Sequence, residues 1–196
     1  MFTGIVEQVG NVVAAQDHET HRTLELSGHD LGTMEVGSSI AVNGVCLTAI
    51  TVDNADVTVN VIPETLQRSN LGALIEGDPI NLELPMLASG RFDGHIVQGH
   101  VDGVGVIATV TADEAGTVMT VTPPKELMSF IVEKGSITLD GVSLTVAGLT
   151  DDTFSVALIP HTLEITTLGL RKPGDAVNLE VDVLAKYVER LLEKRK

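Results

Sequence analysis

Residues 37–48 read Gly-Ser-Ser-Ile-Ala-Val-Asn-Gly-Val-Cys-Leu-Thr, and residues 134–145 read Lys-Gly-Ser-Ile-Thr-Leu-Asp-Gly-Val-Ser-Leu-Thr. The two stretches are identical at 6 of 12 positions and lie 97 residues apart. In each stretch, Asn-Gly or Asp-Gly separates two runs rich in β-forming residues, and these dipeptides tolerate the positive φ angles of a tight turn. The pattern therefore predicts the same β-hairpin twice.

The rest of the chain repeats in nearly the same register. Residues 61–72 align with residues 158–169, again at an offset of 97. At an offset of 95, Gly4, Val6, Val9 and Gly10 match Gly99, Val101, Val104 and Gly105. A period this long that occurs twice is typical of a duplicated domain and is too long for a solenoid. We expect a first domain over residues 1–97, a second over residues 98–182 and a tail over residues 183–196.

Short apolar runs separated by Gly, Asn-Gly or Asp-Gly predict β-strands in both halves. In the first half the runs are Gly4–Val13, Thr23–Leu26, Ser39–Val42, Cys46–Val52, Val57–Val61 and Pro79–Leu84. Pro63 and Pro160 each open a segment expected to form a helical turn, because proline suits the first helical position. A small closed barrel with one capping helix per half fits this pattern better than an open sandwich. The predicted fold is all-β, with two tandem closed barrels.

The tail changes to helical spacing. Its apolar residues fall on one side of a helix that starts at Val183, and they are Leu184, Tyr187, Val188, Leu191 and Leu192. A helix of about 14 residues is marginal alone in water and must bury such a stripe. Two interpretations are open: the tail docks on its own barrel, or it associates with the tails of other copies.

Composition excludes several functions. The chain has 12 Lys and Arg against 27 Asp and Glu, a net charge of −15. Binding to nucleic acid or anionic lipid needs clustered cations, so neither partner is expected. No apolar run reaches the roughly 18–20 residues of a membrane span, and the first basic residue, Arg22, comes too late for a signal peptide. We therefore expect a cytoplasmic protein. The single cysteine excludes an internal disulfide and a multi-cysteine metal site.

The two copies differ in chemistry at four places. Cys46 becomes Ser143, Gly37 becomes Lys134, Ile5 becomes His100, and Glu64 becomes His161. A duplicated domain that only had to fold could keep both copies alike, so these residues are candidates for divided labour. For Cys46 two interpretations stand side by side: a small buried apolar residue, or a chemical group. Thr48 and Thr145 adjoin the Cys/Ser pair and are further candidates.

Two histidines lie where the repeats join. His95 and His100 occur in Phe-Asp-Gly-His-Ile-Val-Gln-Gly-His-Val-Asp-Gly. A metal site that combines them with Asp102 is conceivable, but the spacing matches no recognised ligand set, so no metal is expected. The favoured interpretation is an imidazole that acts as acid or base near neutral pH. The glycine pattern does not match a phosphate loop, which excludes a nucleotide site of that kind.

Five motifs make the chain similar to the α-type riboflavin synthases. They are Met-Phe-Thr-Gly-Ile-Val-Glu, Asn-Gly-Val-Cys-Leu-Thr, Gly-His-Ile-Val-Gln-Gly-His-Val-Asp-Gly, Asp-Gly-Val-Ser-Leu-Thr and Ile-Pro-His-Thr-Leu. The resemblance runs from Met1 to the terminal helix, in register in both halves. It implies two similar six-stranded barrels and a C-terminal helix that joins three chains into a homotrimer.

The resemblance also implies an activity. Two molecules of 6,7-dimethyl-8-ribityllumazine exchange a four-carbon unit, which gives riboflavin and 5-amino-6-(D-ribitylamino)uracil in the last step of riboflavin biosynthesis. This is a transferase reaction that requires no metal or redox cofactor. The reacting pair is expected where the N-terminal barrel of one chain faces the C-terminal barrel of its neighbour. Association with lumazine synthase, which some family members show, is an option for this chain.

The ligand residues follow from the same resemblance. For the first barrel they are Gly4, Ile5, Val6, Cys46, Leu47, Thr48, Asn60, Val61, Ile62, Pro63, Glu64 and Thr65. For the second they are Gly99, His100, Val101, Ser143, Leu144, Thr145, Ala157, Leu158, Ile159, Pro160, His161 and Thr162. Lys134 is expected to reach a ligand across the chain interface.

Four of these residues are assigned to chemistry. His100 is expected to transfer the proton, Ser143 and Thr145 to orient or polarise one ring, and Cys46 to contact the other ring or its adduct. Covalent attack by the Cys46 thiolate is disfavoured, because cationic neighbours are needed and the surrounding sequence has none. Two other functions remain open: a non-catalytic lumazine or flavin antenna on the same fold, and a β-barrel adaptor for a protein partner.

Overall fold

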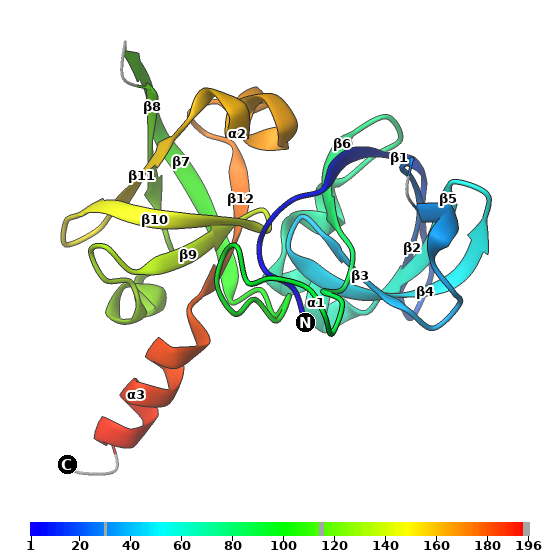
Figure 1. The fold of residues 1–196 in the computed structure, drawn as a ribbon, viewed down its shortest axis with the longest axis horizontal. Helices are drawn as coiled ribbons and strands as arrows, with labels where there is room; N and C mark the ends of the chain where they lie inside the picture. The colour runs from blue at the N-terminus through cyan, green and yellow to red at the C-terminus, as the bar shows by residue number, and fades with distance from the viewer. Residues whose placement is uncertain (30, 114–115, 194–196) are drawn as a thin grey trace.

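The computed structural model describes residues 1–29, 31–113 and 116–193, and it consists of two closed barrels. Each barrel has six antiparallel strands, as the sequence resemblance implied, and the two lie side by side (Figure 1). The first barrel is ordered β1-β2-β5-β4-β3-β6 and the second β10-β11-β8-β7-β12-β9. Closure removes the sheet edges that would otherwise expose unpaired backbone groups.

The strand bounds show how closely the two barrels match. The first contains β1 (Gln8–Asp17), β2 (Arg22–Ser27), β3 (Ser39–Val42), β4 (Val45–Asp53), β5 (Asp56–Val61) and β6 (Pro79–Glu83). The second contains β7 (Gly103–Asp113), β8 (Gly116–Thr122), β9 (Ser136–Leu139), β10 (Val142–Leu149), β11 (Phe154–Leu158) and β12 (Ala176–Val181). Helices α1 (Pro63–Arg68) and α2 (Pro160–Ile165) begin at the two prolines, as predicted. Short 3₁₀ turns are η1 (Leu31–Thr33), η2 (Asn70–Ala73), η3 (Lys125–Phe130) and η4 (Thr167–Leu170).

The two predicted hairpins are confirmed. Asn43 and Asp140 have the same φ of 45°, followed by φ of 77° at Gly44 and 83° at Gly141. The tips join β3 to β4 and β9 to β10. A Cβ on Gly44 would lie 2.6 Å from the Gly141 nitrogen, so the two tips meet back to back between the barrels. Only glycine permits this approach.

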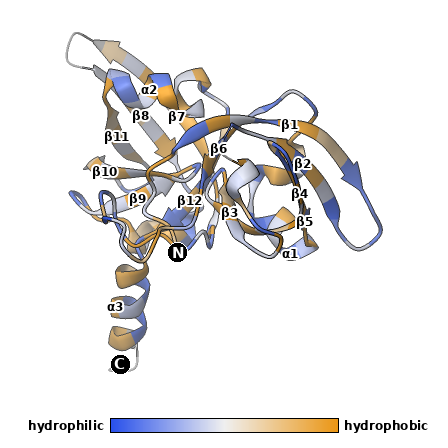
Figure 2. Ribbon diagram, turned by 45° about the vertical axis from the view of Figure 1, so that its right-hand side comes forward, coloured by the Kyte–Doolittle hydropathy of each residue, from blue (hydrophilic) through white to orange (hydrophobic). Residues whose placement is uncertain are grey.

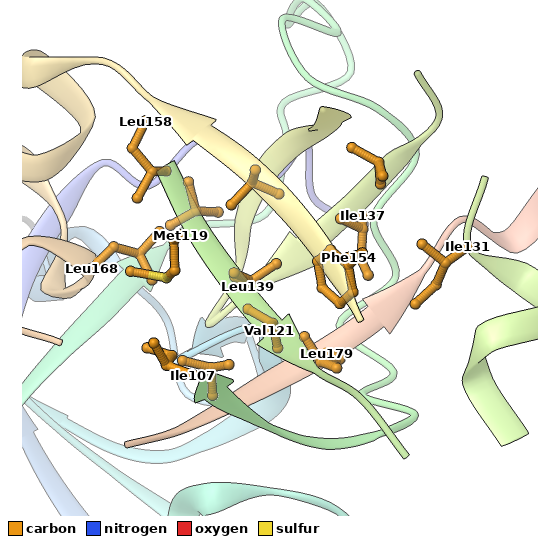
Figure 3. Close-up of a cluster of buried hydrophobic side chains, with 14 of the residues drawn as sticks. Ile107, Met119, Val121, Ile131, Ile137, Leu139, Phe154, Leu158, Leu168 and Leu179 are labelled. Carbon is orange, nitrogen blue, oxygen red and sulfur yellow. The ribbon is translucent and has the colours of Figure 1, made fainter. Parts of the chain in front are cut away.

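Each barrel encloses its own apolar core. In the second barrel, Met119 and Val121 from β8, Ile137 and Leu139 from β9, and Phe154 from β11 converge on one core (Figure 3). The burial pattern of β11 alternates along the strand, which is the period of a side chain facing the barrel interior. The first barrel has an equivalent core.

The N-terminal segment breaks this separation, and here the strand prediction was wrong. The run Gly4–Val13 was expected to form one strand, but β1 begins only at Gln8. Val6 instead packs in the core of the second barrel, while Val101 packs against the core of the first. Gly4 has a φ of 76°, which turns the chain before β1. The two halves therefore exchange their leading segments.

Paired asparagines fasten the two halves together. The Asn178 side chain donates to the Asn43 carbonyl at 2.8 Å, and the Asn81 side chain donates to the Asp140 carbonyl at 2.9 Å. Asp140 is fully buried, and its Oδ2 accepts from Arg171 at 2.6 Å. Burial raises the pKa of Asp140, and the Arg171 cation opposes that rise. The centre of the molecule is thus polar and hydrogen-bonded, with one charged pair.

Helix α3 (Val183–Glu193) extends away from both barrels (Figure 1). Its first turns touch η3, and Lys186 forms an ion pair of 2.7 Å with Asp102. The apolar stripe nevertheless remains open, with Leu184, Tyr187 and Leu191 each more than half exposed (Figure 2). Docking of this stripe on the chain's own barrels, one of the two interpretations above, is therefore wrong.

Candidate functional site

A cavity opens beside Cys46 at the mouth of the first barrel. It has a volume of about 290 Å³ and is lined by residues of β4, β5, α1 and the β5–α1 junction: Cys46, Leu47, Thr48, Ile50, Asn60, Ile62 and Thr65. A second cavity of about 140 Å³ shares Cys46 and Thr65 and extends to Glu64, Arg68, Gly99, His100 and Val101. Together they form one site with Cys46 at its centre. The side chain of Cys46 is half-buried and carries a free thiol.

The backbone that covers Cys46 comes from the second half of the sequence. The Cys46 amide donates to the Gly99 carbonyl at 2.9 Å. A Cβ on Gly99 would lie 2.6 Å from the Cys46 Cβ, so the backbone of residue 99 presses directly on Cys46. His100 follows at the exposed rim. The Gly99–His100 segment therefore belongs to the first-barrel site.

The same arrangement occurs at Ser143 in the second barrel. The Ser143 amide donates to the Gly4 carbonyl at 2.7 Å, and a Cβ on Gly4 would lie 2.6 Å from the Ser143 Cβ. The expected grouping of ligand residues was consequently wrong in one respect. Gly4, Ile5 and Val6 lie at the second barrel, and Gly99, His100 and Val101 at the first, because the leading segments are exchanged.

Two buried glutamates hold these segments in place. Glu83, at the end of β6, accepts from the amides of Thr3 and Gly4 at 2.6 and 3.1 Å. Glu180, at the matching place in β12, accepts from the amides of Gln98 and Gly99 at 2.8 and 2.9 Å. Burial raises the pKa of both carboxyls, and the amide hydrogen bonds oppose the rise.

His95 is a site residue that the catalytic assignment missed. Its Nδ1 lies 2.8 Å from the Ser143 Oγ, while its Nε2 is buried without a hydrogen-bond partner among the described residues. Burial lowers the pKa of His95, and the Asp182 charge opposes this only in part. The shift favours the neutral imidazole, whose unprotonated nitrogen can accept a hydrogen bond. The motif Gly-His-Ile-Val-Gln-Gly-His contained the signal, but the repeat alignment gave His95 no counterpart.

Arg68 is a site residue that the sequence analysis did not name. It lies one helical turn after Glu64 in α1, forms an ion pair with it, and lines the cavity that contains Cys46. The sequence near Cys46 contains no cation, but α1 brings one to the same cavity from 22 positions further along the chain. The Arg68 charge is already balanced by Glu64, which limits its influence on the thiol.

Several expected ligand residues belong to the barrel cores. Leu47 and Val61 are buried in the first core, and Leu158 is buried in the second. Val61 and Leu158 face the barrel interiors, whereas Leu47 also borders the Cys46 cavity. The side chains of Ile62 and Ile159 are about 60% exposed at matching places and form apolar rims. Such rims suit the face of a planar ring.

Lys134 is exposed and has a φ of 65°, a conformation that favours glycine. Its counterpart, Gly37, has a φ of 92°. The second half thus keeps a long cationic side chain at a position whose backbone suits glycine. Contact with a ligand of a neighbouring chain stays a prediction.

The described residues form no metal site, and a separate groove lies on their surface. In the described part of the chain, no group of three or more His, Cys, Asp or Glu side chains could hold a metal ion. His95 bonds to Ser143 and Asp102 to Lys186, so the conceivable His95–His100–Asp102 cluster does not form. Across the described residues, no helix is long and apolar enough to cross a membrane. An open groove of about 810 Å³ lies between the N-terminal segment and residues 84–93.

Two barrels, whose Cys46 and Ser143 amides each bond to backbone from the other half, and a cavity of about 290 Å³ at Cys46 define a duplicated barrel protein with a small-molecule-sized site. The family described as Lumazine binding domain matches residues 3–85 and again residues 98–182. Riboflavin synthase of Actinobacillus pleuropneumoniae is 44% identical over 196 residues, which cover 100% of this chain and 91% of that protein. The Mycobacterium tuberculosis (strain H37Rv) riboflavin synthase is 48% identical over 98% of each chain. The chain belongs to the riboflavin synthase family of lumazine-binding proteins.

Solved structures agree on the fold. LumP complexed with riboflavin superposes with a TM-score of 0.85 at 25% identity, over 93% of this chain and 100% of that chain. LumP complexed with 6,7-dimethyl-8-(1'-D-ribityl) lumazine gives a TM-score of 0.84 at 23% identity, over 93% and 99% of the two chains.

Proposed function

We propose that this protein is a riboflavin synthase, which converts two molecules of 6,7-dimethyl-8-ribityllumazine into riboflavin and 5-amino-6-(D-ribitylamino)uracil. The observation that carries the proposal is the duplicated site, with Cys46 in one copy and Ser143 in the other. A reaction between two copies of one substrate needs two similar pockets that treat the copies differently. Because a four-carbon unit passes from one molecule to the other, the enzyme is a transferase. The two products together contain the atoms of two substrates, so no external oxidant or reductant is needed.

The chemistry makes two demands on the protein. One lumazine loses a proton from its C7 methyl group, and the other is activated at C7 by a nucleophile. Holding two rings in near-attack geometry supplies roughly 7–11 kcal/mol of the barrier. The side chains then contribute proton transfer and orientation, for which His100, Ser143, Thr145 and Cys46 are the proposed groups.

His95 extends this assignment at the second barrel. A neutral imidazole 2.8 Å from the Ser143 hydroxyl can accept its hydrogen bond and strengthen the hydroxyl oxygen as an acceptor. We assign His95 to this positioning role. Thr65 and Thr162, which lie at matching places in the two helical turns, are assigned to ribityl hydroxyls.

A homotrimer is the proposed assembly. Support comes from the exposed apolar stripe of α3, which needs a partner to be removed from water. Within the trimer, the first barrel of one chain would face the second barrel of its neighbour. The cytoplasm as compartment, and association with lumazine synthase, stay predictions.

One experiment separates the synthase from its rivals. Purified protein is mixed with 6,7-dimethyl-8-ribityllumazine alone, without metal or nucleotide, and riboflavin is followed by absorbance and chromatography. One riboflavin per two lumazines consumed supports the proposal. Tight, fluorescent binding without riboflavin would instead establish an antenna. A colourless, inactive protein that retains a stable protein partner would favour an adaptor.

A further inference from the structure

The two glutamates described above form a reciprocal arrangement. Glu180 is a residue of the second barrel, yet the backbone it holds walls the Cys46 cavity of the first. Glu83 is a residue of the first barrel, yet the backbone it holds presses on Ser143 of the second. Both side chains are at most 5% exposed. Each carboxylate thus holds a backbone segment that covers the site of the opposite barrel.

At the first site, two hydrogen bonds made by Gly99 connect Glu180 to Cys46. The Gly99 amide donates to Glu180 Oε2 at 2.9 Å, and the Gly99 carbonyl accepts from the Cys46 amide at 2.9 Å. The amide of Gln98 adds a second bond to the same carboxylate at 2.8 Å. Gly99 is therefore fixed from both sides, and His100 takes its position from Gly99.

The second site repeats this geometry. Gly4 donates to Glu83 through its amide at 3.1 Å and accepts from the Ser143 amide at 2.7 Å through its carbonyl. The Thr3 amide and hydroxyl add bonds of 2.6 and 3.0 Å. Carboxylates that accept from backbone amides form stronger hydrogen bonds than neutral groups do. Because these hydrogen bonds are buried, they hold the backbone that donates them in a single position.

We propose that Glu180 and Glu83 are positioning residues that act across the two barrels, Glu180 on the Cys46 site and Glu83 on the Ser143 site. The proposal rests on the proposed function only for the identity of the ligand. It predicts that loss of either carboxylate loosens the site in the opposite barrel and leaves the site in its own barrel in place.

Cys46 makes the proposal measurable, because it is the single cysteine of the chain and lies in the first-barrel site. The rate at which N-ethylmaleimide, a neutral reagent, modifies Cys46 reports how firmly the Gly99 segment covers it. The matched variants are Glu180→Gln and Glu83→Gln, which remove the same buried group from the two barrels. In Glu180→Gln the Gly99 segment loses its charged acceptor and should cover Cys46 less firmly. We expect modification of Cys46 to be about tenfold faster in this variant. Glu83→Gln is expected to stay within about twofold of the unsubstituted protein, since Thr3 and Gly4, which Glu83 holds, do not line the Cys46 cavities. Their neighbour Phe2 belongs to the buried cluster against which Cys46 packs, and it does not line these cavities either.

Acceleration at Cys46 that is confined to Glu180→Gln is what generic destabilisation cannot produce. Equal acceleration in both variants, or acceleration in Glu83→Gln alone, would overturn the proposal. If a Gln variant does not fold, Glu180→Asp and Glu83→Asp apply the same comparison, because shortening the side chain withdraws the carboxylate from the amides while keeping its charge. Riboflavin, added as the ligand probe, should slow the modification of unsubstituted protein. Failure of that protection would count against the proposed function, while the comparison without ligand still decides the positioning role.

Discussion

His95 and Ser143, 48 positions apart in the sequence, lie with Nδ1 and Oγ 2.8 Å from each other. Gly94 permits the contact, because a Cβ there would lie 3.0 Å from the Ser143 Cβ and 2.0 Å from the Thr3 carbonyl oxygen. The residue that matches Ser143 in the first barrel is a thiol, Cys46. The second site therefore has a hydroxyl that is hydrogen-bonded to a histidine, whereas the first site has a free thiol.

Removing the imidazole tests this difference. We expect His95→Gln to lower turnover by about a hundredfold, at the low end of acid–base effects, because Ser143 loses its partner. Riboflavin affinity should change much less, since the cavity walls stay in place. Steady-state kinetics and riboflavin titration measure the two effects. His18→Gln, on the exposed tip of the β1–β2 hairpin, serves as control; a similar loss there would remove the assignment.

The same histidine predicts a pH dependence of stability. Its folded pKa lies below the ordinary value of 6.5, so the unfolded chain binds the proton more readily. The stability associated with neutral His95 is fully present above pH 6.5 and declines as pH falls from 6.5 through the lowered folded value. Urea unfolding across this window should show a smaller decline in His95→Gln. Parallel curves for the two proteins would contradict the burial of this imidazole.

Gly99 offers a test of close packing. A Cβ would lie 2.6 Å from the Cys46 Cβ and 2.8 Å from the Cys46 nitrogen, and φ is 75°. Gly37 provides the matched control, since its φ is 92° but no heavy atom lies within 4 Å of the position that a Cβ would take. Gly37→Ala should cost about 1–2 kcal/mol from backbone strain alone. Gly99→Ala should cost more and should also abolish riboflavin binding at the first barrel. Thermal unfolding and ligand titration provide the comparison.

The buried ion pair between the halves can be replaced by the residues of the first repeat. Arg171→Leu copies Leu74 and leaves Asp140 buried without its cation, at an expected cost of about 3–5 kcal/mol. Adding Asp140→Asn, which copies Asn43, removes the uncompensated charge and should recover most of that loss. Urea denaturation of the four proteins measures the coupling. Strict additivity of the two single effects would show that the pair is not coupled.

The stripe on α3 governs the proposed assembly. Leu191→Lys places a charge in the centre of the exposed apolar surface and should shift the protein towards monomer in sedimentation equilibrium. Glu189→Gln, on the polar side of the helix, should leave the oligomeric state unchanged. If Leu191→Lys sediments like the unsubstituted protein, the helix does not hold the trimer together. Activity should fall with dissociation, because the proposed trimer brings the reacting pair together between neighbouring chains.

Local signals were enough for most of the fold. Asn43-Gly44 and Asp140-Gly141 predicted the hairpins because positive φ is a property of the dipeptide itself, and Pro63 predicted a helix start for a similar reason. The path of Gly4 could not be read in this way. Whether a strand-like run stays in its own barrel depends on which core offers a place for Val6, and that is a tertiary choice. Arg68 was missed for the same reason, because only the folded position of α1 brings this side chain into the Cys46 cavity.

The exchange of leading segments also bears on how such a protein could arise. Neither repeat contains a complete pocket, because each lacks the glycine segment that closes it. A single ancestral repeat would have worked only as a pair of identical subunits, each lending its first residues to the other. Joining the two copies in one polypeptide fixed that partnership at a ratio of one to one. With both copies in one polypeptide the two positions are free to differ, and here one carries the thiol of Cys46 and the other the histidine-paired hydroxyl of Ser143.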